Sequence, residues 1–546
     1  MSDPSDRAKQ ASVLAVFGIG LLLRAIYLAC AGEQTLVTLV PDDAFYYLKT
    51  ARNIAAGLGS TFDGVHPTNG YHPLWMGLLL PAAALAPSPL ALVRVALAMG
   101  TALSFLTALV LYRLVRRATA IWYIPLLALI LFFLNPRAVA SSLNGLETCL
   151  STFLFTLVLA LVLSEAGGTT RGRGRGFEAA LGLLLGLLFL ARTDNVFFVA
   201  AFYAAAVALA ERPVRWRRAA VMAALAAVVA APWLAWSWAR FGSPVQVSGL
   251  SVPWVHHELF RLEGHTALQA VGHGIKIFLV LLWEGLRGEI GYPRAFSATA
   301  ILLSLIVFAV RWRDPGCTVG MRRSALVLLG VAAASLAQTF VHSAIRWYPR
   351  PWYFDQLMVF LPVVFALAFA LFEPGQTVPR AVRLLYPAAA PLNAFSRGLL
   401  GLALVGVVAV PTACSVQTLA RGDWPWAREM LAAAHWLRDN TPRDAVAASF
   451  NAGIIGYFSG RRVVNLDGSI DNAAYAALRH RELMAFMERS GVGYYLDFEP
   501  MTTESFGPFF GPLAMHASMK VIHEIVLPGA DWEGSNIRIH KIGVRP

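Results

Sequence analysis

Two adjacent acids, Asp42 and Asp43, stand a few residues after the first long apolar run of the chain. They precede a segment whose residues predict a helix over 44–56, ended by glycine. A carboxylate at the start of a helix can act as a general base, orient a hydroxyl or hold a cation. It can also cap the helix. We predict that Asp42 is the base, because Asp43 immediately precedes the helix and is the better cap residue.

Further polar side chains lie in the short segments that separate later apolar runs. Glu147 opens one such run, and a carboxylate at bilayer depth indicates a functional or paired side chain. Arg192 and Asp194 are close enough in sequence to pair, so an internal ion pair and a binding role both stay open. The candidate substrate-binding residues are Glu147, Asp194, Asn195, His72, Arg346, Tyr348 and Arg350. The last three could equally anchor an aromatic belt at the membrane interface.

Composition places these segments in a membrane. Apolar residues make up 57% of the 546 residues, charged residues make up 14%, and the mean hydropathy is +0.58. A soluble domain carries about 25% charged residues, so this chain lacks the polar surface to cover a globule of its size. The net charge of +13 does not indicate nucleic-acid binding, because the arginines stand in short clusters between apolar runs. The sequence predicts a polytopic α-helical membrane protein without a nucleic-acid partner.

The distribution of arginine predicts the topology. Clusters at 113–117, 171–175 and 212–218 alternate with the polar motifs, as the positive-inside rule requires of cytoplasmic loops. We expect about eleven spans in a bacterial inner (plasma) membrane, with the N-terminus in the cytoplasm and the C-terminus periplasmic or extracellular. The apolar runs at 119–135 and 295–312 are two of these predicted spans. The run at 11–31 is too long for a signal peptide and predicts an uncleaved first span. The Pro-bounded segment 73–87 predicts an interfacial or re-entrant helix.

The composition changes near residue 417, which predicts two domains. Residues 1–416 form the membrane domain, with a first outer loop at about 32–88. Residues 417–546 are expected to form an extracytoplasmic α/β domain, because helical patterns at 424–440 and 471–489 alternate with strand-like runs. Those runs lie at 445–450, 461–468, 492–498, 519–527 and 536–542.

The order of these motifs resembles that of the GT-C superfold, whose members are membrane glycosyltransferases that use polyprenyl-phosphate sugars. That family carries an acidic pair soon after its first span, to which D-D-A-F-Y-Y-L-K-T-A-R-N, starting at Asp42, is similar. The later G-L-E-T, R-T-D-N and F-G-S-P segments also resemble family motifs, although R-T-D-N departs from the expected R-P-[DE]-G. The tail from His435 resembles the outer domain of the branch that contains mycobacterial terminal arabinofuranosyltransferases.

The resemblance implies an inverting glycosyltransferase that moves a sugar from a polyprenyl-phosphate donor to a cell-envelope glycan, lipid or protein on the outer face. It implies that Asp42 or Asp43 is the catalytic base and that Arg346 and Arg350 bind the phosphate. A polyprenyl phosphate leaves as a stabilised anion, so one base and cationic stabilisation suffice. Asp43 is also the candidate ligand for a divalent cation such as Mg, Mn or Ca.

Two other classes of protein stay open on the sequence alone. A transporter or flippase for an amphipathic lipid should carry charges within its middle spans and interrupted helices in two matching halves. Neither pattern is evident in this sequence. A non-catalytic membrane scaffold would use its α/β domain to bind a partner, but it would leave the position of Asp42 and Asp43 unexplained.

Overall fold

Uninterrupted apolar sequence forms the long helices of this chain, because a backbone in lipid must satisfy its hydrogen bonds within one helix. The computed structural model describes residues 4–119, 121–168, 175–282, 318–344, 350–370, 394–511, 519–526 and 536–543. Five helices in this part are long and apolar enough to cross a membrane. They are α1 (Pro4–Cys30), α5 (Pro89–Ala118), α8 (Thr148–Ala166), α11 (Arg215–Phe241) and α16 (Val319–Ala344).

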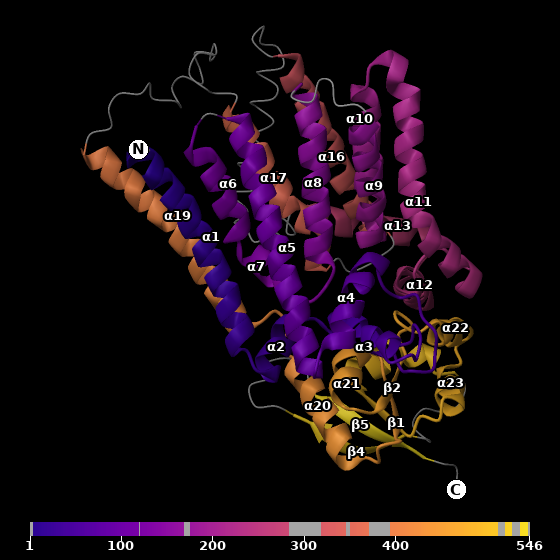
Figure 1. Cartoon of the computed structure of the whole chain (residues 1–546). Coiled ribbons are helices and arrows are strands. Elements are labelled where there is room, and N and C mark those ends of the chain that lie inside the picture. Colours follow the sequence, from indigo (N-terminus) through magenta and orange to yellow (C-terminus); the bar gives the residue numbers. More distant parts are fainter. Residues whose placement is uncertain are drawn as a thin grey trace.

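Shorter apolar helices complete the bundle seen in Figure 1. The predicted span at 119–135 contains one helix, which is bent by 57° against the short helix that follows it. The bend falls at Asn135, whose side chain caps the second helix, and at Pro136, which starts it. The shorter helices are α6 (Tyr123–Phe133), α7 (Pro136–Ser142), α9 (Arg175–Ala191), α10 (Val196–Leu209), α13 (Ala267–Val280) and α17 (Asp355–Ala370). Helix α19 (Ala394–Arg421), with 28 residues, is a further long helix. The predicted span at 295–312 lies outside the described residues.

Among the described residues, the basic cluster around Arg217 and the polar motifs around Glu147 and Arg192 occupy opposite ends of the bundle. Glu178, in the first turn of α9, pairs with Arg217 at 3.1 Å in the first turn of α11. At the other end of α9, Arg192 pairs with Glu147, which immediately precedes α8. The small sheet domain and the first outer loop lie at this second end (Figure 1).

The first outer loop contains three helices: α2 (Glu33–Leu39), α3 (Asp42–Ala55) and α4 (Pro73–Leu85). The helix predicted over 44–56 is confirmed but begins earlier, at Asp42. The segment 73–87 forms α4, whose 13 residues are fewer than a span needs. A further helix, α12 (Val247–Leu262), follows α11 beside this loop (Figure 1).

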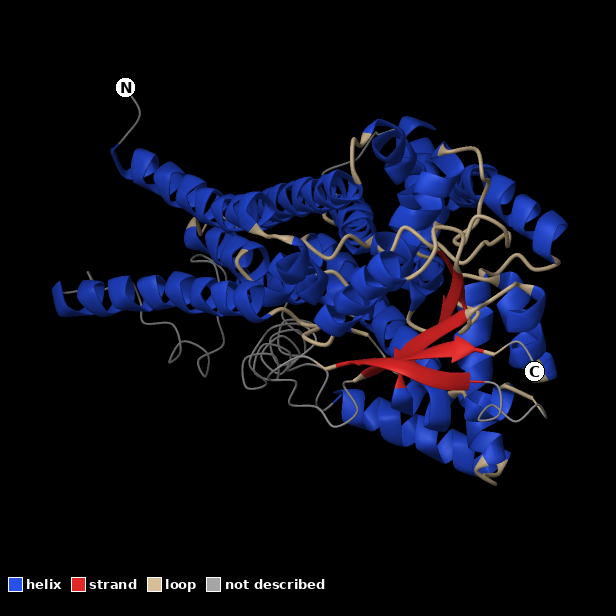
Figure 2. Ribbon diagram, turned by 90° about the horizontal axis from the view of Figure 1, so that it is seen from below, coloured by secondary structure: helices blue, strands red, loops and turns tan. Residues whose placement is uncertain are grey.

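The C-terminal residues form an α/β domain with one five-stranded sheet of order β2-β1-β3-β5-β4 (Figure 2). Strands β2, β1 and β3 are parallel, whereas β5 and β4 are antiparallel to their neighbours. The five predicted strands are confirmed as β1 (Val446–Ser449), β2 (Arg462–Asn465), β3 (Tyr494–Phe498), β4 (Met519–Ile525) and β5 (Ile537–Ile542). The helices are α20 (Ala427–Asn440), α21 (Ala452–Phe458), α22 (Asn472–His480) and α23 (Leu483–Arg489).

The single helix predicted over 471–489 is wrong, because two helices, α22 and α23, occupy this segment. Arg481 adopts a left-handed conformation with φ of 56°, which ends α22. Helix α21 was not predicted, because its seven residues are too few to show a helical period. It is nevertheless one of the elements that join the two domains.

Helix α21 packs directly against α3 of the first outer loop. The ring of Phe45 lies 5.4 Å from Tyr457 and 5.5 Å from Phe458, measured between ring centroids. The Tyr457 hydroxyl also donates to the carbonyl of Pro89, the first residue of α5. Burial of aromatic rings stabilises such a contact substantially. The C-terminal α/β domain (the outer domain) is therefore fixed against α3, the helix that carries the acidic pair.

Candidate active site

Both acids of the pair lie in the first turn of α3, where the partial positive charge of the helix end favours carboxylates. The prediction that Asp43 is the N-cap is wrong. Pro41 occupies the cap position without a side-chain hydrogen bond, and the helix already includes Asp42. Adjacent helical residues point about 100° apart, so the two carboxylates face different surroundings.

Asp42 caps a helix of the other domain. Its Oδ2 accepts the N–H of Gly453 at 3.0 Å, and its Oδ1 accepts the N–H of Ile454 at 2.6 Å. These are the second and third residues of α21, whose N–H groups have no partner within the helix. Burial raises the pKa of Asp42 to about 7, although both hydrogen bonds oppose this shift. The contacts of Asp42 thus serve domain packing.

Asp43 remains accessible to solvent, unlike most of α3. Desolvation by the surrounding protein nevertheless raises the pKa of its carboxyl. Arg350 opposes this shift, and the negative charge of Glu147 adds to it. Asp43 therefore presents an accessible carboxylate on which the charges of Arg350 and Glu147 both act.

The G-L-E-T segment with Glu147 and the R-T-D-N segment meet through Arg192. Its guanidinium contacts Glu147 Oε1 at 2.6 Å and donates two hydrogen bonds to Asp194, at 3.0 and 2.8 Å. The Tyr353 ring lies 4.9 Å from the same guanidinium. Glu147 Oε2 is buried and has no hydrogen-bond partner among the described residues. The Tyr47 hydroxyl also interacts with this carboxylate, and among the described residues Oε2 can still accept a further hydrogen bond.

His72 lies beside this network and is held in one tautomer. Its Nδ1 faces two donors, Gln246 Nε2 at 2.9 Å and the N–H of Thr193 at 3.4 Å. Its Nε2 lies 3.8 Å from Glu147 Oε1. Burial lowers the pKa of His72, which favours the neutral ring. Because Nδ1 accepts, Nε2 carries the proton and points it toward Glu147.

Asp194 and Asn195 have different surroundings, although they are neighbours in sequence. Asp194 also accepts from Gln338 at 3.1 Å. Asn195 is fully buried and bonds Ser151 at 2.9 Å and Gln356 at 3.1 Å. Its contacts lie between helices, so its observed role is structural packing.

Arg350 is the described member of the predicted phosphate-binding group. Its side chain is exposed, and its guanidinium carbon lies 5.9 Å from the centre of the Trp424 ring. Its charge also acts on Asp43, as the pKa of that carboxyl shows. Arg346 and Tyr348 lie outside the described residues.

The outer domain adds an acid that sequence reasoning missed. Asp467 lies in the N-L-D-G turn after β2, where burial, and to a smaller extent the charge of Asp43, raises its pKa. The sequence pattern that could have identified Asp467 is the turn dipeptide Asp467-Gly468 shortly after a buried strand. The polar groups of Asp43, Glu147 and Asp467 thus come from three segments far apart in sequence.

The described residues do not form a ready-made metal site. No group of three or more His, Cys, Asp or Glu side chains converges so as to hold an ion in this part of the chain. The Asp42 carboxylate is occupied by the backbone of α21. The divalent cation expected at Asp43 therefore stays a prediction.

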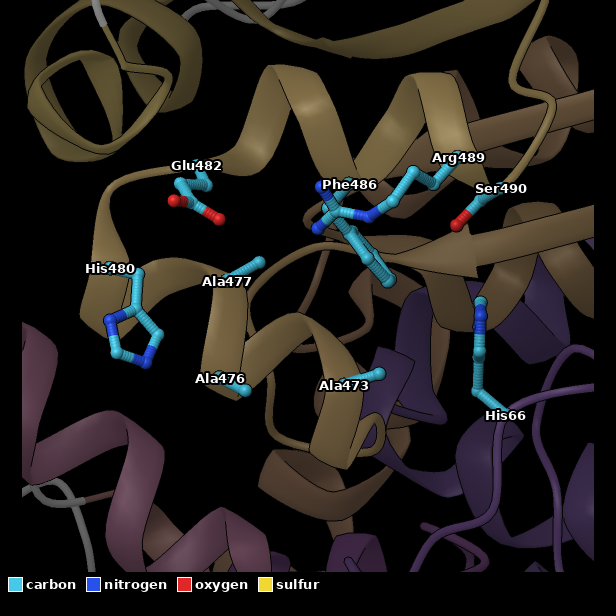
Figure 3. A pocket seen from close by; sticks show the side chains of 9 residues that line it. All are labelled: His66, Ala473, Ala476, Ala477, His480, Glu482, Phe486, Arg489 and Ser490. Atoms are coloured by element: carbon cyan, nitrogen blue, oxygen red, sulfur yellow. The ribbon is translucent and has the colours of Figure 1, made fainter.

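A separate cavity of about 340 Å³ opens on the outer domain (Figure 3). Helix α22 provides alanines along its side, while Phe486, Arg489 and Ser490 line it from α23 and the residue that follows. His66 of the first outer loop completes the lining. None of the acids described above lines this cavity, so it is distinct from the candidate active site.

Comparison with known proteins establishes the fold. A family model described as a domain of unknown function, DUF8728, matches residues 420–536. No curated protein sequence matches the chain. The archaeal oligosaccharyltransferase AglB from Archaeoglobus fulgidus, solved with an inhibitory peptide and a dolichol-phosphate, is 14% identical with a TM-score of 0.59. The match covers 93% of this chain and 71% of that chain.

The protein is therefore a polytopic helical membrane protein of the GT-C fold with a small C-terminal sheet domain. ArnT from Cupriavidus metallidurans, solved with undecaprenyl phosphate bound, is also 14% identical with a TM-score of 0.57. That match covers 97% of both chains. The similarity at this identity shows a shared fold. It does not test the arabinofuranosyltransferase branch, which stays a prediction.

Proposed function

We propose that this protein is an inverting membrane glycosyltransferase that moves a sugar from a polyprenyl-phosphate donor to a cell-envelope acceptor. The observation that carries the proposal is the accessible carboxylate of Asp43 in the first turn of α3 of a GT-C fold, on which the charges of Arg350 and Glu147 act. The solved proteins with this fold include one bound to dolichol-phosphate and one bound to undecaprenyl phosphate. These ligands support a lipid-phosphate donor for this chain.

Asp43 acts as the base in this proposal, in place of Asp42. It removes the proton of an acceptor hydroxyl while that oxygen attacks the anomeric carbon of the donor. The bond from this carbon to the phosphate oxygen breaks, and the electron pair leaves with the polyprenyl phosphate anion. A single displacement inverts the configuration at the anomeric carbon. The raised pKa of Asp43 makes it a stronger base than an ordinary aspartate.

Arg350 stabilises the charge that develops on the leaving phosphate. Its guanidinium is exposed beside Trp424, where the planar donor group can form two hydrogen bonds to phosphate oxygens. The hydrogen bonds of Arg192 to Glu147 and Asp194 fix the positions of these two carboxylates. Glu147 Oε2 can then accept a hydrogen bond from a substrate hydroxyl. Binding and positioning together provide the main catalytic effect.

The finer features of the reaction belong to the same proposal. The resemblance of the C-terminal segment to terminal arabinofuranosyltransferases favours a pentofuranose donor and an acceptor on the outer face of a bacterial inner membrane. The basic cluster that includes Arg217 lies at the end of the bundle opposite Asp43, which supports a cytoplasmic position for that end.

Replacement of Arg350 tests the donor class. In Arg350→Gln we expect the affinity for undecaprenyl phosphate to fall about tenfold or more, because a charge-assisted hydrogen bond contributes about 1.5–3 kcal/mol. The quenching of tryptophan fluorescence by the lipid provides the measurement. Arg438→Gln is the matched control, because that exposed arginine pairs only with Asp439 on the outer domain. Equal affinity in wild type and Arg350→Gln would contradict the assignment.

A further inference from the structure

The turn after β2 holds Asp467 in a fixed position. The N–H of Ser469 donates to Asp467 Oδ1 at 2.7 Å, and the N–H of Gly468 donates to Asn465 Oδ1 at 3.1 Å. Gly468 has φ of 71°, and a Cβ there would lie 2.8 Å from Cα of Tyr475. The turn therefore requires glycine and leaves little freedom for the aspartate beside it.

The membrane domain holds this turn from several sides. Ser251 of α12 donates to the carbonyl of Asp467 at 2.5 Å. The Tyr46 hydroxyl of α3 lies 3.3 Å from Asn465 Nδ2. Gly70 of the first outer loop lies so close that a Cβ there would be 2.2 Å from the carbonyl oxygen of Ser469. The position of Asp467 is thus set by elements of the membrane domain as well as by its own.

Asp467 lies on the same side of α3 as the proposed base. Asp43 and Tyr46 are three residues apart and share one face of the helix, and Tyr46 contacts the turn. The negative charge of Asp43 acts on both Tyr46 and Asp467. Burial, the larger cause, raises the pKa of Asp467 to about 6. The two carboxylates therefore border the same region from two domains.

We propose that Asp467 is an acceptor-positioning residue that binds a second hydroxyl of a sugar acceptor while Asp43 deprotonates the attacking hydroxyl. This inference rests on the proposed function and specifies its acceptor. An ionised carboxylate only accepts hydrogen bonds, so it suits a ligand with several hydroxyl donors. Glu147 Oε2, which is buried and can accept a further hydrogen bond among the described residues, also suits a ligand that donates.

The negative charges of Asp43 and Asp467 further restrict the chemical class of the acceptor. An acceptor with a phosphate or carboxylate next to its attacking hydroxyl would be repelled by Asp43 and Asp467. A serine or threonine side chain offers one hydroxyl, which leaves the second carboxylate without a donor. A neutral glycan or glycolipid with adjacent hydroxyls satisfies both groups. The outer domain thus contributes to the choice of acceptor.

The test compares transfer with donor hydrolysis in the full-length protein. The donors are undecaprenyl-phosphate-linked glucose, mannose and arabinose, and the acceptors are octyl glycosides of the same sugars. In Asp467→Asn we expect the KM for the octyl glycoside to rise about tenfold or more, with kcat within about threefold. Transfer to water in the absence of the glycoside should be unchanged, because water needs no second hydroxyl contact.

Two further variants make this test specific. Asp444→Asn is the matched control, because Asp444 is an exposed acid before β1, at the opposite end of the parallel strands. Asp467→Glu keeps the charge but moves it, so we expect a smaller rise in KM. Thermal stability is measured for each variant. If Asp467→Asn does not fold, the acceptor KM of Asp467→Glu decides the test.

The outcomes separate the inference from the proposed function. Unchanged acceptor KM in both Asp467 variants, or a loss of kcat with equal loss of donor hydrolysis, overturns the positioning role alone. Wild-type protein that neither transfers nor hydrolyses any of these donors, and does not bind undecaprenyl phosphate, overturns the proposed function and this inference with it.

Discussion

Two adjacent aspartates of one helix turn have different tasks because their surroundings differ. Asp42 accepts two backbone N–H groups of α21, whereas Asp43 stays accessible to solvent. Sequence reasoning could identify the pair but not the division of roles. The partner that occupies Asp42 lies 411 positions away along the chain, and local spacing carries no information about it.

Asp42→Asn should destabilise the protein by about 1–3 kcal/mol, because the amide retains one acceptor and turns a donor toward the second N–H group. Asp43→Asn is the neighbouring control and should leave stability unchanged or slightly higher, since burial disfavours its charge. Thermal denaturation in detergent measures both variants. Equal stability of Asp42→Asn and wild type would show that the contact with α21 is unimportant.

The first outer loop and the outer domain are joined by an ionic cluster in addition to α21. His66 Nδ1 lies 3.1 Å from both Asp63 and Asp471, and Arg462 pairs with Asp63 at 3.0 Å. The two carboxylates, Asp471 first, raise the pKa of His66 to about 10. The cluster therefore holds a protonated histidine between elements of both domains at neutral pH.

This cluster predicts a pH dependence at the domain junction. A histidine with a raised folded pKa contributes stability that is complete below its ordinary pKa of about 6.5 and is lost as pH rises toward 10. We expect the melting temperature to fall across this range in wild type and to fall less in His66→Gln. His480→Gln is the control, because His480 is exposed on α22. Parallel pH curves for wild type and His66→Gln would refute the prediction.

Elements with a strong local pattern were predicted correctly from sequence. The strands β1 to β5, the helix of the acidic pair and the long apolar helices lie where the residue pattern placed them. Asp467 and α21 were missed for a common reason. Their positions near α3 result from long-range packing, to which Gly70 and Gly453 contribute by allowing close backbone approach. Such contacts leave little trace in the periodicity of a single sequence.

At the scale of the whole molecule, the chemistry lies where two domains meet at one end of the helical bundle. The basic cluster with Glu178 and Arg217 lies at the other end. The alternation of arginine clusters and polar motifs therefore predicted the two ends correctly. The number of spans could not be fixed in the same way, because helices such as α10 and α13 are shorter than a membrane is thick.

The central claim is that this end of the molecule transfers sugar with Asp43 as base. The decisive measurement is turnover from an undecaprenyl-phosphate-linked sugar to an octyl glycoside for wild type, Asp43→Asn and Asp42→Asn, normalised to folded protein. We expect turnover to fall about 10²-fold or more in Asp43→Asn and to stay within a few-fold of wild type in Asp42→Asn. Full turnover in Asp43→Asn would contradict the account.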